Sequence, residues 1–143
     1  MNADEVLASL GLLPHPEGGH YRETWRAPAP EDERPAATAI YFLLRAGERS
    51  HWHRIDAAEM WHYYAGAALE LAIAPDDHGP ITNVSLGPDL ARGERPQIVV
   101  PAHAWQAGRS LGAWTLVGCT VTPAFDFAAF ELAPPDWEPG SRT

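Results

Sequence analysis

Apolar positions along the chain fall into short runs separated by Gly-, Pro- or Asp-bearing turns, a pattern typical of strands. The segment Thr-Ala-Ile-Tyr-Phe-Leu-Leu-Arg at 38–45 is nearly continuously apolar, which predicts a strand buried on both faces or lining a barrel. Further strands are expected at 20–26, 50–54, 59–64, 68–74, 81–86, 97–100, 114–121 and 125–132. Short strands at this spacing predict an all-β sandwich or barrel.

The chain has one clear helix signal, at its N-terminal end. Asn2 can cap a helix with Glu5 three places on, and Gly11 stands where a helix C-terminus favours a positive φ. The segment 13–19, Leu-Pro-His-Pro-Glu-Gly-Gly, has the composition of a turn, so Glu17 is interpreted as turn chemistry. We expect one domain over 1–143, with a helix at 3–11, a barrel at about 20–133 and a tail at 134–143 that is extended as a cover or loose.

The charge composition excludes several function classes. The 143 residues contain 10 Lys+Arg, all of them arginine, against 19 Asp+Glu, for a formal net charge of −9. Without lysine there is no Schiff-base or pyridoxal phosphate (PLP) enzyme and no nucleotide-binding P-loop. The acidic balance makes a nucleic-acid partner unexpected. The single cysteine, Cys119, lies in an apolar strand and is interpreted as a small buried hydrophobe.

Nothing in the sequence indicates a membrane or an export signal. No apolar run approaches the roughly 20 residues needed to span a bilayer, and the first residues are acidic where a signal peptide is basic. We therefore expect a cytoplasmic protein with no membrane partner.

The sharpest chemical signal is His51-Trp52-His53 followed by Glu59. Residues two apart on a strand share a face, so the two imidazoles can point to one place, and Glu59 can return beside them after a turn. Two imidazoles and a carboxylate suit Fe, Mn, Ni or Zn. The alternative is a pair of solvated or hydrogen-bonded histidines without a metal.

Other side chains are candidates to surround this site. If Glu59 faces inward, strand parity puts Trp61 and Tyr63 on the same face, as a pocket wall or as barrel core. The Tyr41 hydroxyl, in an apolar strand, can donate a proton to a substrate or bond a neighbouring backbone group. Glu23 can supply a second carboxylate for substrate binding.

The chain resembles the cupin superfamily. Gly47, His51, His53, Glu59 and Gly66 resemble its first motif, and Pro-Ala-His-Ala-Trp-Gln at 101–106 its second. The segments at 12–19, 21–24, 38–44, 59–66 and 125–132 extend the similarity to a small single-domain subfamily of unknown function.

This resemblance implies a double-stranded β-helix (jelly-roll) barrel, usually a homodimer, with a pocket at its mouth that often holds a divalent metal. It places Gln106 where the last metal histidine of the family stands, so His51, His53, Glu59 and Gln106 form the expected ligand set. His103 replaces the glycine of the second motif; it can add an acid–base group that binds substrate, or be a rim histidine in water.

Two functions follow from the sequence. The first is a metal-dependent enzyme of isomerase, epimerase or oxygenase type that acts on a small organic metabolite, with Glu59, His53 and Tyr41 as catalytic residues. The second is a binding module that holds such a metabolite without turning it over, which the replacement of a ligand histidine by Gln106 favours. A structural or protein-interaction domain is a third possibility.

Overall fold

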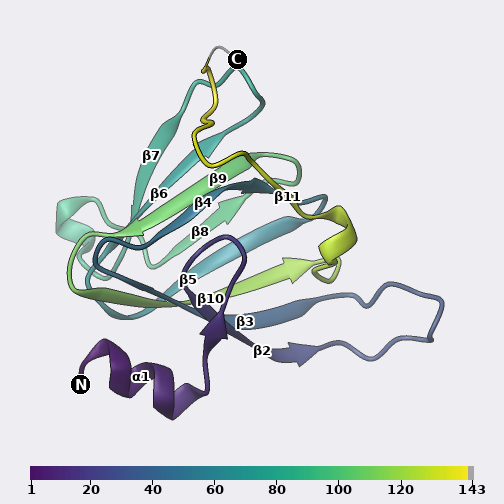
Figure 1. The fold of residues 1–143 in the computed structure, drawn as a ribbon, viewed down its shortest axis with the longest axis horizontal. Coiled ribbons are helices and arrows are strands. Elements are labelled where there is room, and N and C mark those ends of the chain that lie inside the picture. Colours follow the sequence, from purple (N-terminus) through teal and green to yellow (C-terminus); the bar gives the residue numbers. More distant parts are fainter. Residues whose placement is uncertain (142–143) are drawn as a thin grey trace.

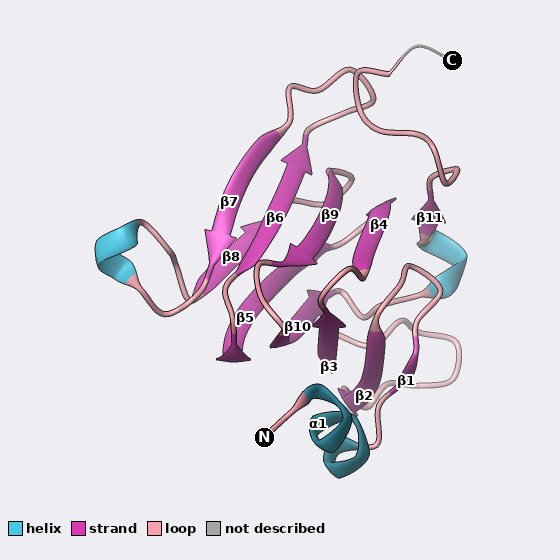
Figure 2. Cartoon of the chain, turned by 60° about the vertical axis from the view of Figure 1, so that its left-hand side comes forward, coloured by secondary structure: helices cyan, strands magenta, loops and turns pink. Residues whose placement is uncertain are grey.

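The computed structural model describes residues 1–141 as two antiparallel β-sheets stacked face to face (Figures 1 and 2). The first sheet has the strand order β1 (Leu13–Pro14), β2 (His20–Arg26), β3 (Thr38–Arg45), β10 (Trp114–Thr122), β5 (Ala58–Gly66), β8 (Gln97–Val100). The second has the order β11 (Glu131–Leu132), β4 (Arg49–Arg54), β9 (Trp105–Ser110), β6 (Leu69–Ala74), β7 (Thr82–Leu86). The predicted all-β jelly roll with a short N-terminal helix is confirmed.

The main core lies between the sheets, where each strand contributes alternate side chains. Phe42 and Leu44 face it from β3, Trp61 from β5, and Leu69 and Leu71 from β6, all at most 1 % exposed. This alternation also points Glu59, two residues before Trp61, into the same space; its exposure is 8 %.

The helix α1 (Ala3–Leu10) forms as predicted. The Asn2 side chain accepts from the Glu5 amide and the Glu5 side chain accepts from the Asn2 amide, while Gly11 ends the helix with a φ of 66°. Val6 of the helix packs on Leu12 and Leu43, so the helix covers the outer face of the first sheet. No helix within residues 1–141 is long and apolar enough to cross a bilayer.

The tail after β11 is a cover on the outer face of the second sheet (Figure 1). The Ala133 amide donates to the Trp52 carbonyl at 3.0 Å, and the Trp137 ring lies 4.6 Å from the ring of Trp105. Ala133, Trp52 and Trp105 with Ala74 form a second apolar cluster on this face.

Two segments differ from the prediction. The strand expected at 125–132 is wrong: the Asp126 side chain accepts from the Ala128 amide and starts the 3-10 helix η2 (Phe127–Ala129), which leaves only β11 as a strand. Strand β9 was not predicted, because Trp-Gln-Ala-Gly-Arg-Ser has no apolar alternation and contains a glycine. A further 3-10 helix, η1 (Leu90–Arg92), lies between β7 and β8.

Candidate functional site

A β-bulge in β4 sets which of its side chains enter the barrel. Ser50 pairs with Gly108 and His53 with Gln106, so three residue steps on β4 match two on β9. The extra residue breaks the two-residue alternation. Ser50 and His53 are therefore the inward pair, at 0 % and 2 % exposure.

The bulge turns His51 away from His53. The His51 Nε2 lies 2.8 Å from the Pro134 carbonyl oxygen, on the side of the sheet that the tail covers. The expected convergence of His51 with His53 and Glu59 is not what the structure shows, because that prediction assumed an unbroken strand.

A tight turn brings a different residue, Glu17, to His53. The His51 amide donates to the Glu17 carbonyl at 2.8 Å, which fixes the 15–19 turn against β4. Gly18 has a φ of 108°, and a Cβ there would lie 2.0 Å from the Arg49 carbonyl oxygen. Only glycine allows this close approach, which places the Glu17 side chain inside the barrel.

His53 and Glu17 form a buried ion pair. The His53 Nε2 lies 2.9 Å from Glu17 Oε2, and its Nδ1 lies 2.8 Å from the His51 carbonyl oxygen. Both ring nitrogens face acceptors, so the imidazolium, which donates from both, satisfies the site. Burial works to lower the pKa of His53, but the charge and hydrogen bond of Glu17 outweigh it and raise that pKa from 6.5 to about 9.

Glu59 is held by a chain of hydrogen bonds that crosses both sheets. The Trp61 Nε1 donates to Gln106 Oε1 at 2.8 Å, and Gln106 Nε2 donates to Glu59 Oε1 at 2.8 Å. Because an indole nitrogen only donates, Trp61 fixes the amide with its oxygen toward the indole and its NH₂ toward the carboxylate.

The pKa of Glu59 is raised from 4.5 to about 7. Its main cause is burial, to which the Glu17 carboxylate adds, while His53, the Gln106 amide and the Cys119 thiol oppose it. The balance is the opposite for Glu17. Burial works to raise the pKa of its carboxyl, but the effect of His53 is larger and lowers that pKa. Burial raises the pKa of the Cys119 thiol well above its usual value, so that this cysteine is no nucleophile.

Three phenylalanines, Phe125, Phe127 and Phe130, form an aromatic cover over one end of this group. The Phe130 ring lies 5.5 Å from the His53 ring and 6.0 Å from that of His15. Phe127 contacts the other two phenylalanine rings and is 52 % exposed. The cover therefore separates the buried His53 from solvent.

His15 is a neutral imidazole beside the ion pair. The Glu17 amide donates to His15 Nδ1 at 3.1 Å, which leaves Nε2 to carry the proton. Burial lowers the pKa of His15, although the Glu17 carboxylate works in the opposite direction.

We call Glu17, His53, Glu59 and Gln106 the interior polar group. The last three were predicted from sequence, and Trp61 lies beside them as expected. Glu17 and His15 were missed because Pro-Glu-Gly-Gly is also an ordinary turn sequence. The two consecutive glycines were the available signal, since they permit a close approach of backbones.

The remaining predicted residues lie elsewhere. Tyr41 faces outward from β3 and packs edge to face against Tyr64 at 6.2 Å. The Tyr63 ring packs on the core, but its hydroxyl donates to the Gly66 carbonyl at 2.6 Å. Glu23 is exposed and pairs with Arg26 at 2.7 Å, and His103 is exposed on a turn with a φ of 69°.

The interior polar group does not fit the expected metal site. Both His53 nitrogens are engaged by oxygen atoms of Glu17 and His51, the His51 ring faces the tail, and the Gln106 oxygen faces Trp61. A ligand must offer a lone pair, which an imidazolium lacks. Within residues 1–141, no group of three or more His, Cys, Asp or Glu side chains is placed to hold a metal ion.

The interior polar group lines none of four hollows found on residues 1–141. The nearest to the aromatic cover has a volume of about 520 Å³ and is lined by Phe125 and Phe127 together with Arg26, Arg34 and the acidic segment 31–33. A molecule that reaches Glu59 from this side must displace the cover.

Comparison with known proteins matches the chain to one family and to two similar solved structures. Residues 4–133 match the family described as cupin superfamily (DUF985). A crystal structure of a Shewanella oneidensis protein is 43 % identical, with a TM-score of 0.87 over 93 % of this chain and 85 % of that one. A hypothetical protein from Leishmania major is 32 % identical, with a TM-score of 0.86 over 93 % and 88 %. Among curated proteins, none matches the chain.

More distant structures share the fold alone. Oxalate decarboxylase from Bacillus subtilis is 14 % identical, with a TM-score of 0.64 over 83 % of this chain and 29 % of that one. A dTDP sugar isomerase from Desulfovibrio desulfuricans is 15 % identical, with a TM-score of 0.60 over 83 % of each chain.

Proposed function

The chain belongs to the cupin superfamily, in the family DUF985, and from that premise we propose that its barrel interior is an acid–base site for a small organic molecule. The observation that carries the proposal is the buried carboxyl of Glu59, whose pKa is about 7 and which interacts with the charge of His53. A carboxyl with this pKa both accepts and returns a proton near neutrality. Perturbed groups of this kind gather at functional sites.

The reaction that suits these residues is proton transfer at a carbon next to a carbonyl, as in isomerases and epimerases. The Glu59 carboxylate takes the proton from carbon, and the electron pair moves toward the carbonyl oxygen. The His53 imidazolium stabilises the negative charge that develops there when its Nε2–H is shared between Glu17 and the substrate oxygen. Glu59 then returns the proton to a carbon, so no electron is gained or lost.

The other residues of the group position these two. Glu17 keeps His53 protonated and oriented at 2.9 Å, and Gln106 fixes one oxygen of Glu59 at 2.8 Å. The aromatic cover excludes water once a substrate is bound. The proposal includes no metal, because the side chains of the interior polar group bond to one another or to Trp61 and do not converge on one position where a metal could lie. The fold neighbour named as a sugar isomerase is only 15 % identical, so the reaction class depends on these residues.

A non-catalytic metabolite-binding module is the second candidate. It is favoured by the mutual hydrogen bonds of the interior polar group and by the lining of the four hollows named above, none of which includes a residue of that group. A binding module holds its ligand but leaves its C–H bonds unchanged.

Exchange of carbon-bound hydrogen in D₂O distinguishes the two. Small hydroxyketones, aldehydes and sugars are incubated with the protein, and loss of C–H signals is followed by proton NMR. We expect exchange with at least one compound, reduced about 100-fold or more in Glu59→Gln and retained in Asp89→Asn, an exposed loop control. Saturable binding without exchange supports the binding module. Exchange that Glu59→Gln leaves unchanged contradicts the acid–base role.

A further inference from the structure

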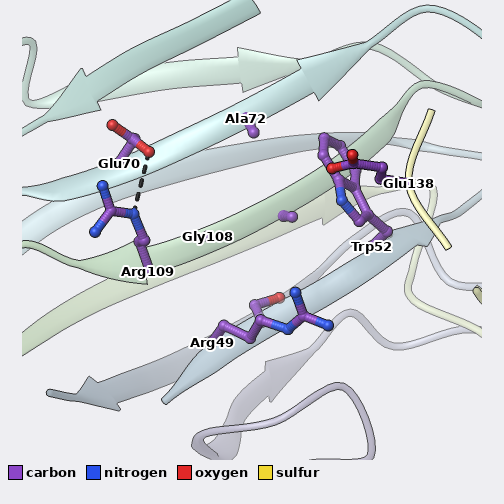
Figure 3. A pocket seen from close by; sticks show the side chains of 9 residues that line it. Arg49, Trp52, Glu70, Ala72, Gly108, Arg109 and Glu138 are labelled. Atoms are coloured by element: carbon purple, nitrogen blue, oxygen red, sulfur yellow. Dashed lines mark hydrogen bonds and ion pairs between the residues drawn. The ribbon is translucent and has the colours of Figure 1, made fainter. Parts of the chain in front are cut away.

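A second hollow lies on the outer face of the second sheet, remote from the interior polar group (Figure 3). Its volume is about 250 Å³. Its floor consists of Ala72 on β6 and Ala107 and Gly108 on β9, and Trp52 of β4 forms one wall. The floor is apolar and its side chains are small, so a space remains above the strands.

The tail covers only part of the outer face of the second sheet, and this determines where the hollow is bounded. Ala133 and Trp137 cover the half of the face that contains Trp105. Beyond them the tail contributes only Glu138 to the hollow. The uncovered half of the face is thus a bounded recess rather than a flat sheet surface.

Charged side chains of both signs surround the apolar floor. The Arg109 Nε is paired with Glu70 Oε1 at 3.2 Å. Arg49 donates to the Pro135 carbonyl at 3.0 Å, and within residues 1–141 no carboxylate pairs with it. Glu138 lies across the floor, beside Trp52, and pairs with no cation of the described chain (Figure 3). The recess therefore has one unpaired cation and one unpaired anion at separate positions.

Trp52 adds a polar group that lacks a partner. The residue is 6 % exposed, yet its indole N–H donates to no residue of the described chain. The indole nitrogen is not among the buried side-chain atoms that lack a partner, so it is accessible to solvent and free to donate to a molecule bound in the recess.

We propose that this recess binds a small zwitterion of the amino-acid type. The carboxylate of the ligand pairs with Arg49 and accepts from the Trp52 indole. Its ammonium group pairs with Glu138, and a short apolar side chain lies over Ala72 and Ala107. The two arginines and two glutamates of the lining give the recess no net formal charge. A simple anion is therefore attracted less than a zwitterion, which meets both signs of charge.

Three probes with the same isobutyl side chain test the charge requirement: L-leucine, 4-methylpentanoate, which lacks the ammonium group, and 3-methylbutylamine, which lacks the carboxylate. Binding is followed by the indole N–H resonance of Trp52 in ¹H–¹⁵N NMR spectra, assigned with Trp52→Phe. Arg49→Gln and Glu138→Gln are compared with Arg92→Gln, an exposed arginine outside the recess.

We expect saturable binding of leucine, at least about tenfold tighter than that of either single-charge analogue. Arg49→Gln and Glu138→Gln each weaken it by about tenfold or more, and Arg92→Gln leaves it unchanged. The proposal is overturned if leucine causes no saturable shift, if the three probes bind equally, or if the two recess variants bind as the wild type does. None of these outcomes affects the proposed chemistry at Glu59, which lies inside the barrel.

Discussion

The carboxylate of Glu17 lies 2.9 Å from the Nε2 of His53, although the two residues come from a turn before β2 and from β4 in the other sheet. Both side chains are nearly inaccessible, at 6 % and 3 % exposure. A buried pair of this kind is costly to break, because removal of one partner leaves the other charge uncompensated.

Replacement of Glu17 by Gln should lower the free energy of unfolding by about 3 to 5 kcal/mol near pH 6. The folded-state pKa of His53 is raised from 6.5 to about 9, so the stabilisation is complete below pH 6.5 and is lost as pH rises through 9. The difference in the free energy of unfolding between wild type and Glu17→Gln should therefore be smaller at pH 10 than at pH 6. Urea unfolding at the two pH values measures it. A difference that is the same at both would contradict the ion pair.

Replacement of Glu59 by Gln should stabilise the protein at alkaline pH. Because folding raises the pKa of Glu59 from 4.5 to about 7, the native state loses stability as pH rises through this interval, and a glutamine does not. The unfolding free energy of Glu59→Gln relative to wild type should increase by roughly 1 to 3 kcal/mol between pH 4 and pH 8. Glu31→Gln, an exposed loop variant, should show no such change. A pH-independent difference would refute the raised pKa.

Replacement of Gln106 by Leu should cost about 1 to 3 kcal/mol, because it leaves the Trp61 indole N–H and the Glu59 carboxyl without their partner. The same change should raise the pKa of Glu59 further, since a hydrogen bond to its charged form is lost. Thermal unfolding and a pH titration of the Glu59 carboxyl by ¹³C NMR measure the two effects. The exposed Gln97→Leu on β8 is the matched control and should be nearly neutral.

Replacement of Trp137 by Ala should loosen the tail and cost about 1 to 3 kcal/mol, because the ring packs on Trp105 at 4.6 Å but remains partly exposed. Trp25, which is 52 % exposed, supplies the control, with an expected loss below about 0.5 kcal/mol for Trp25→Ala. Equal losses in the two variants would show that the tail is not a packed cover.

The sequence allowed most strands to be predicted, but not β9 or the 3-10 helix η2. It also gave the inward direction of Glu59 and Trp61, because β5 keeps its alternation along that stretch. Alternation failed at β4, where the bulge turns His51 outward and brings Ser50 inward. Sequence gives little warning of a bulge, since the extra residue needs no particular side chain. The two glycines after Glu17 indicate a close backbone approach, but not its partner. That partner is the Arg49 backbone, which only the folded chain brings to the Gly18 turn.

The central claim is that His53 is a protonated partner of Glu17 and not a metal ligand. It is tested most directly by a ¹⁵N NMR titration of the histidine rings in the wild type and in Glu17→Gln. We expect both His53 nitrogens to carry protons at neutral pH, with a midpoint near 9 that falls markedly in the variant, because the charge and hydrogen bond of Glu17 are lost. A neutral His53 ring at pH 7 with the same midpoint in both proteins, or a ring whose Nε2 shift responds to added divalent metal, would contradict it.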